Sequence, residues 1–110
     1  GLASEESFFQ VRLKQSPEKI QQLLLQYKNI AKYQYQGGST NHHVNLPNGV
    51  PTTFFYTSDA SIESFPATYE ILVLDAKHKG TPSFKWNHGD SYGVAIDSSA
   101  SEIVYWTEKW

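Results

Sequence analysis

The chain of 110 residues has no cysteine, and Arg12 is its one arginine. The absence of cysteine excludes disulfides, thiolate catalysis and thiolate metal sites, and it is typical of proteins that work in a reducing compartment. Nine cations and eleven carboxylates give a formal net charge of −2. A protein that binds the phosphate backbone of nucleic acids generally has a net positive charge, so strong sequence-independent binding to nucleic acid is not expected.

Long apolar runs are also missing, and the longest is too short to cross a bilayer, so no contact with a membrane is expected. Hydrophobic residues make up 39% and charged residues 18% of the chain, which argues against disorder. The length fits a single domain over residues 1–110. Such a domain can bury a core without metal or disulfides.

One helix is predicted to begin at Ser16-Pro17-Glu18. The serine can cap the first N–H groups, proline suits the first helical position, and glutamate complements the helix dipole. Apolar residues then recur at helical spacing along one stripe: Ile20, Leu23, Leu24, Tyr27 and either Ile30 or Ala31.

Strands are predicted at residues 7–13, 52–57, 68–75, 83–86, 92–96 and 102–107. Short polar turns separate most of them, including residues 79–82, 87–90 and 97–99, and this spacing favours an antiparallel meander. The predicted fold class is therefore α+β, with one N-terminal helix packed on a small, twisted antiparallel sheet of about four to five strands.

Glu70 is the first candidate for chemistry. In an extended strand, Tyr69, Ile71 and Val73 share one face, and the other face carries Glu70 in a mostly apolar row. Burial there would raise the pKa of its carboxyl group and suit it to proton transfer. The alternative interpretation is a glutamate at the solvated margin of the sheet.

The four histidines, His42, His43, His78 and His88, do not form a metal-binding pattern. His42 and His43 are adjacent in a loop, and no third ligand lies at a helical or strand spacing from them. His78 and His88 lie in predicted turns and are read as surface residues. No motif for a phosphate loop or a nucleophilic serine occurs, so neither a metal nor a cofactor is expected.

Aromatic residues are frequent, at 15% of the chain. They fill small cores and favour strands, and exposed rings can also stack on bases. For any one ring the core interpretation is favoured. The lysines Lys77, Lys79 and Lys85 lie close together in the sequence, where they form either a local basic patch or a solvated loop, the second being favoured.

The order of elements resembles the microbial guanyl-specific ribonucleases, the family of barnase and the fungal ribonucleases and ribotoxins. Three stretches carry the resemblance. Residues 38–49 (Gly-Ser-Thr-Asn-His-His-Val-Asn-Leu-Pro-Asn-Gly) are similar to the histidine segment and guanine-binding turn, residues 67–74 (Ala-Thr-Tyr-Glu-Ile-Leu-Val-Leu) to the strand of the general base, and residues 89–96 with 101–107 to the last two strands.

The resemblance implies catalytic positions that this chain fills only in part. Glu70 matches the general base, and His42 or His43 matches the loop histidine. Ser91 or Tyr92 stands where the arginine is expected. Trp106, or Tyr105 one place away, stands where the acid histidine is expected. Losing one general acid commonly lowers the rate by about 10²–10⁴. The resemblance therefore implies a protein that is not an enzyme, with RNA contacts expected at Asn45, Asn48, Tyr92 and Trp106.

Ribonuclease-like folds without catalytic residues are typical of the effectors secreted by powdery mildew fungi. Residues 9–11, Phe-Gln-Val, stand in the place of the aromatic-x-Cys motif of that family, with valine in place of cysteine. The resemblance implies a monomeric avirulence or virulence protein, secreted by a fungal pathogen and acting in the host cell. Its expected partners are a host protein, such as a plant immune receptor, or RNA.

Three hypotheses follow. The first is such a catalytically inactive binder. The second is an active guanyl-preferring ribonuclease or ribotoxin that uses Glu70 with His42 or His43, and the third is an unrelated small α+β interaction module.

Overall fold

The computed structural model describes residues 7–38, 55–56, 62–63, 65–83 and 88–110. Within them the chain forms one helix and seven strands. In chain order these are β1 (Ser7–Lys14), α1 (Pro17–Ile30), β2 (Tyr33–Gln36), β3 (Phe55–Tyr56), β4 (Ile62–Glu63), β5 (Tyr69–His78), β6 (Gly89–Asp97) and β7 (Glu102–Lys109).

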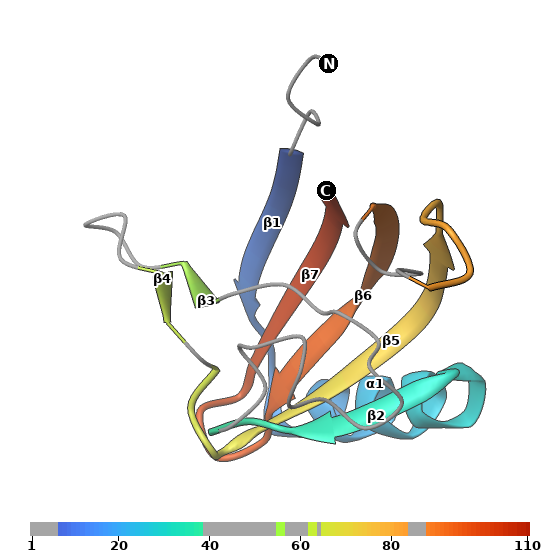
Figure 1. Ribbon diagram of the computed structural model, residues 1–110. Coiled ribbons are helices and arrows are strands. Elements are labelled where there is room, and N and C mark those ends of the chain that lie inside the picture. The colour runs from blue at the N-terminus through green and yellow to red at the C-terminus, as the bar shows by residue number, and fades with distance from the viewer. Residues whose placement is uncertain (1–6, 39–54, 57–61, 64, 84–87) are drawn as a thin grey trace.

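Five of these strands form one sheet in the order β1-β7-β6-β5-β2, and every neighbouring pair is antiparallel. The strands β3 and β4 form a separate two-stranded sheet. Figure 1 shows α1 lying across one end of the large sheet, while the opposite ends of β1, β7 and β6 extend beyond it. The predicted α+β class, with one helix packed on an antiparallel sheet, is confirmed. No helix within the described residues has both the length and the apolar character needed to cross a bilayer.

The helix begins where the sequence predicts. Ser16 Oγ accepts a hydrogen bond from the backbone N–H of Lys19 at 3.1 Å, and Pro17 occupies the first turn. The helix ends at Ile30, after which Ala31 has extended backbone and its N–H still donates to the carbonyl of Tyr27. Ile30 is exposed and Ala31 is half-buried, so the apolar stripe ends on Ala31.

The helix packs on one face of the sheet, which we call the helix face. Its buried stripe, Ile20, Leu23 and Leu24, lies against side chains from β5, β6 and β7. Those side chains are Leu72, Val94, Ile96 and Ile103. Fully burying one such aliphatic side chain contributes about 1.5–3 kcal/mol, so this layer is a main source of stability.

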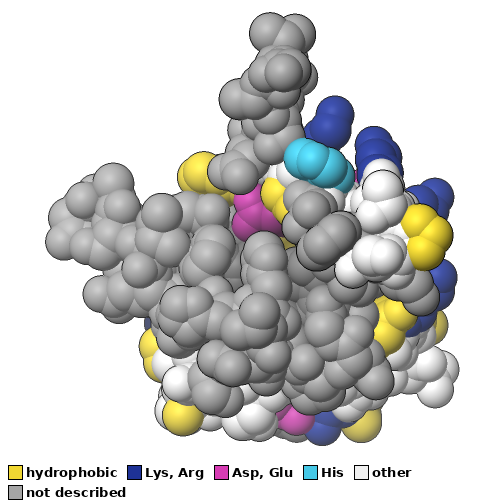
Figure 2. All heavy atoms as spheres, viewed as in Figure 1, with side chains coloured by type: hydrophobic (Ala, Val, Ile, Leu, Met, Phe, Trp, Pro, Cys, Tyr) yellow, Lys and Arg dark blue, Asp and Glu magenta, His cyan; other side chains and the backbone are white. Residues whose placement is uncertain are grey.

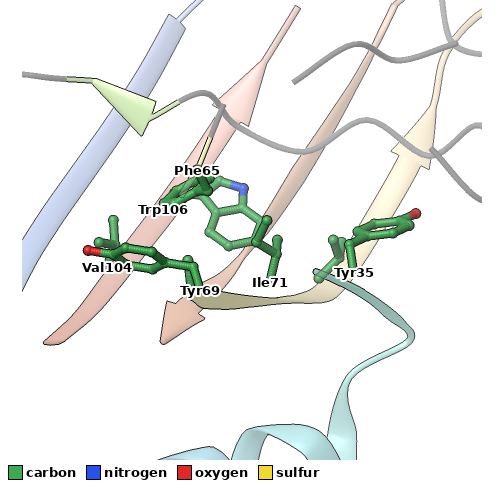
Figure 3. Close-up of a cluster of buried hydrophobic side chains, with 8 residues drawn as sticks. Tyr35, Phe65, Tyr69, Ile71, Val104 and Trp106 are labelled. Carbon is green, nitrogen blue, oxygen red and sulfur yellow. The ribbon is translucent and has the colours of Figure 1, made fainter. Parts of the chain in front are cut away.

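The opposite face of the sheet carries a second cluster, rich in aromatic rings. Figure 3 shows Phe65 lying over Trp106, with Tyr69, Ile71 and Val104 on the same side of the sheet. Tyr35, Val73 and Ala95 complete the cluster. The alternation predicted for residues 69–73 is confirmed, because Tyr69, Ile71 and Val73 belong to this cluster and Leu72 belongs to the helix-face cluster.

The regular alternation of β5 stops at Leu74, where the register against β6 shifts between Val73 and Asp75. A bulge of this kind places one extra residue on one strand and increases the local twist. Beyond it, Asp75 is opposite Tyr92. The strand then continues to His78, three residues past the predicted end.

Several strand predictions need correction. Residues 33–36 pair with β5 as β2, although no strand was predicted there, because alternating tyrosine and glutamine lack the aliphatic signal. A turn was predicted at residues 87–90, but residues 89 and 90 belong to β6. The strand begins at Gly89, whose N–H and carbonyl both form hydrogen bonds with the backbone of Trp110. Ser83 lies in a turn, and the rest of the predicted strand 83–86 lies outside the described residues.

The strand predicted at residues 52–57 is described only as β3, since residues 52–54 and 57 lie outside the described part of the chain. Its partner β4 was not predicted.

Candidate functional site

Glu70 lies on the helix face and is bound by a lysine of the helix. Its Oε1 is 2.8 Å from Lys28 Nζ, and the two side chains are 32% and 40% exposed. Leu72, the next residue of β5 on the same face, is fully buried. Glu70 therefore stands at the solvated margin of the sheet beside the helix, as the alternative interpretation has it, and its carboxylate already holds a cation.

The two residues at the expected acid position lie on opposite faces of β7. Trp106 belongs to the aromatic cluster opposite the helix, whereas Tyr105 faces the helix. The ring of Tyr105 meets that of Tyr27 edge-on, with centroids 6.1 Å apart. Burial raises the pKa of Tyr105 to about 12, helped by a hydrogen bond with Tyr27. Neither side chain is placed to protonate a leaving group beside Glu70.

The two residues at the expected arginine position also separate. Ser91 is buried on the face of Trp106, and Tyr92 points to the helix face with 49% of its surface exposed. The Ser91 hydroxyl and the Trp106 indole N–H are both buried and have no hydrogen-bond partner among the described residues. Tyr92 is thus accessible to a ligand, and Trp106 is a core residue.

Among the described residues, no other candidate from the sequence lies beside Glu70. His42, His43, Asn45 and Asn48 lie outside the described residues. His78 and His88 are exposed near the far end of β5. Eight residues of strand separate Glu70 from His78, which is roughly 26 Å at the rise of an antiparallel strand. In the described part of the chain, no three carboxylate or histidine side chains gather into a metal-binding group.

A polar network around the buried carboxylate of Glu102 lies at the end of the sheet near the β6–β7 turn. Glu102 accepts a hydrogen bond from the Tyr69 hydroxyl and lies 3.4 Å from Arg12 Nε and 3.5 Å from Lys14 Nζ. Burial, followed by the hydrogen bond to Glu102, raises the pKa of Tyr69. The Glu102 carboxylate contacts three donors, from Tyr69, Arg12 and Lys14. These contacts join β1, β5 and β7, so the network has a structural role.

Asp97 closes the same end of the sheet. Burial acts to raise the pKa of its carboxyl group, but donors from Ser99, Thr68 and the backbone of Ala100 together lower it. The Thr68 hydroxyl donates at 2.8 Å and the Ser99 hydroxyl at 2.6 Å. The ionised carboxylate of Asp97 therefore stabilises the turn between β6 and β7.

The helix face is hollowed where α1 no longer covers it. The hollow has a volume of about 370 Å³. Its lining comes from β1, β5, β6 and β7: Phe9, Leu74, Tyr92, Gly93, Val94, Tyr105, Trp106 and Thr107. We call this feature the helix-face hollow. Sequence reasoning named Tyr92 and Trp106 among its residues but missed Phe9, Leu74 and Thr107.

The signal for the missed residues was weak. Phe9 alternates with Phe8 in a strand that is exposed on both sides, so the sequence alone does not say which ring faces a hollow. Leu74 enters the lining at the bulge in β5, and the sequence around it shows an ordinary apolar strand. Both residues are placed by strand register, which local patterns do not encode.

No protein-family model, curated protein or solved structure matches this chain.

Proposed function

We propose that this chain is a catalytically inactive, ribonuclease-like protein that acts by binding. The observation that carries the proposal is the state of Glu70, which is ion-paired with Lys28 on the helix face while Trp106 lies on the opposite face. A general base must be free to approach the proton it removes, within about 2.6–3.2 Å. Trp106 is buried on the opposite face, and its indole N–H does not titrate near neutral pH, so Glu70 and Trp106 cannot act as base and acid on one phosphodiester.

The positions of the catalytic cation and acid also support the absence of cleavage. Tyr92 and Tyr105 are phenols, and the pKa of Tyr105 stands at about 12, so it is a poor proton donor near neutral pH. An effector role follows the resemblance of the sequence: a protein secreted by a fungal pathogen, acting in the host cell on a host protein or RNA and recognised by a plant immune receptor. That part of the proposal rests on the sequence motifs.

The test is incubation of a guanine-containing RNA oligonucleotide with the folded protein at high concentration. Wild type, Glu70→Gln and a control variant, Glu18→Gln, are compared; Glu18 is an exposed carboxylate in the first turn of the helix. We expect intact RNA in all three reactions. Cleavage by wild type and Glu18→Gln that disappears in Glu70→Gln would refute the proposal and identify Glu70 as a base.

A further inference from the structure

The helix-face hollow combines an apolar floor with two exposed aromatic rings. Phe9 is 64% exposed and Tyr92 is 49% exposed, although both are large side chains that proteins generally cover. Val94 and Tyr105 lie in the lining between the hollow and the helix. Two accessible rings beside an apolar depression form a surface that a flat, apolar group can enter.

The strand register sets the spacing of these rings. Phe9 is opposite Thr107, and Thr107 is opposite Tyr92, so the three side chains form one row across β1, β7 and β6. Phe9 and Tyr92 are therefore two strand spacings apart, roughly 9–10 Å. The short side chain of Thr107 stands between them. A row with large rings at both ends and a small residue in the middle leaves room for a planar ring.

Lysines occupy the next row of the same face. Lys77 and Lys109 are both opposite Asp90, one on each side. Asp90 is 3.8 Å from Lys79, and in the part of the chain that the structure describes neither Lys77 nor Lys109 forms an ion pair. The row therefore has a local excess of positive charge although the chain has a net charge of −2.

A fourth lysine lies beside Tyr92. Lys32 Nζ is 2.7 Å from Asp75, which is the cross-strand neighbour of Tyr92. Figure 2 shows lysine and arginine side chains gathered along the right-hand edge of the molecule, the side on which β5 lies in Figure 1. Aromatic platforms beside a basic stripe are the combination that single-stranded nucleic acid requires, because bases stack and phosphates seek cations.

We infer that the helix-face hollow binds single-stranded RNA, with an unpaired base between Phe9 and Tyr92 and the adjoining phosphates on Lys77 and Lys109. This inference rests on the proposed function, because it takes RNA as a bound ligand and not as a substrate. It places the contact on the face covered in part by α1; Trp106 of the aromatic cluster on the opposite face also borders the hollow. Charge complementarity favours RNA as the occupant over an apolar or basic peptide.

The test is fluorescence anisotropy with a labelled single-stranded RNA of mixed sequence, using Phe9→Leu and Tyr92→Leu. Leucine keeps the apolar bulk and removes the stacking face. Stacking on one aromatic ring corresponds to about a 5-fold to 150-fold change in Kd, and we expect each variant to weaken binding within that range. Phe8→Leu is the matched control, since Phe8 is the adjacent phenylalanine on the opposite face of β1, and we expect its Kd to stay within about twofold of wild type.

The lysines are tested by the salt dependence of the Kd. For single strands, each neutralised phosphate contributes about −0.7 to the slope of log K against log salt concentration. Lys77→Gln and Lys109→Gln should each make the slope shallower by about this amount. Lys19→Gln, an exposed lysine on the helix, should leave it unchanged.

The inference would be overturned by no binding of single-stranded RNA at protein concentrations up to about 100 µM, by equal loss of affinity in Phe8→Leu, or by equal affinity for a duplex of the same sequence. The RNA recovered from the same samples is checked for length. Shortened RNA that depends on Glu70 would refute the proposed function, whereas intact RNA with unchanged affinity in Phe9→Leu and Tyr92→Leu would refute the hollow alone.

Discussion

Replacing Trp106 by phenylalanine tests whether its ring belongs to the core or to a binding surface. Trp106 is 3% exposed, and within the described part of the chain its indole N–H has no hydrogen-bond partner. The smaller ring leaves a cavity that costs on the order of 1–2 kcal/mol. Removing a buried, unpaired donor regains roughly 1–3 kcal/mol. Because the two terms oppose each other, we expect Trp106→Phe to keep the free energy of unfolding within about 1 kcal/mol of wild type.

Trp106→Ala gives the comparison, because it removes the whole ring from the aromatic cluster. Its expected cost is about 3–5 kcal/mol, a large part of the marginal stability of a small domain. Urea unfolding followed by far-ultraviolet circular dichroism measures both variants by linear extrapolation. A loss above about 3 kcal/mol in Trp106→Phe would refute the unpaired donor, and a loss below about 1 kcal/mol in Trp106→Ala would refute the core position.

Three further perturbations address the sheet, its turn and the helix. A Cβ on Gly93 would lie 2.2 Å from the carbonyl oxygen of Leu72, so Gly93→Ala should lower the free energy of unfolding by about 1–3 kcal/mol in urea, and wild-type stability would contradict the close approach. The lowered pKa of Asp97 means that its stabilisation is present above the unfolded pKa of about 3.9 and is lost as the pH falls through the folded value. The difference in Tm between wild type and Asp97→Asn should therefore shrink from about pH 6 to about pH 2, and a constant difference would contradict it. Ser16→Ala should cost about 1 kcal/mol through the lost cap, and Ser16→Asp should retain most of the stability; an equal loss in both, measured by urea unfolding, would exclude capping.

The helix and the main strands could be predicted because their signals are local. The cap at Ser16 and the spacing of Ile20, Leu23 and Leu24 define a helix within a single window of sequence. The apolar runs of β5, β6 and β7 likewise predict three strands of the sheet from local sequence. These patterns depend on periodicity, which each segment carries by itself.

The strand β2 and the hollow could not be predicted, because both depend on pairing between distant segments. Tyr33 and Tyr35 become strand residues through their register against Val73 and Ile71, about 40 residues later. Phe9 reaches the hollow because β1 pairs with β7 at the other end of the chain. Nothing in the local sequence fixes such a register.

The candidate catalytic site illustrates the same limit. The alternation of the strand assigned Glu70 to the correct face of β5, but the ion pair with Lys28 required the position of the helix. Tyr92 was chosen as an RNA contact and is exposed beside the hollow, whereas Trp106, chosen with it, is buried. Adjacent strands place the two rings on opposite faces of one sheet.

The central claim, binding without cleavage, is tested most directly by one titration of a labelled, guanine-containing single-stranded RNA with the folded wild-type protein. Anisotropy reports binding, and the length of the RNA in the same samples reports cleavage. We predict that the anisotropy rises while the RNA keeps its full length. RNA that is shortened by wild type and spared by Glu70→Gln would contradict the account.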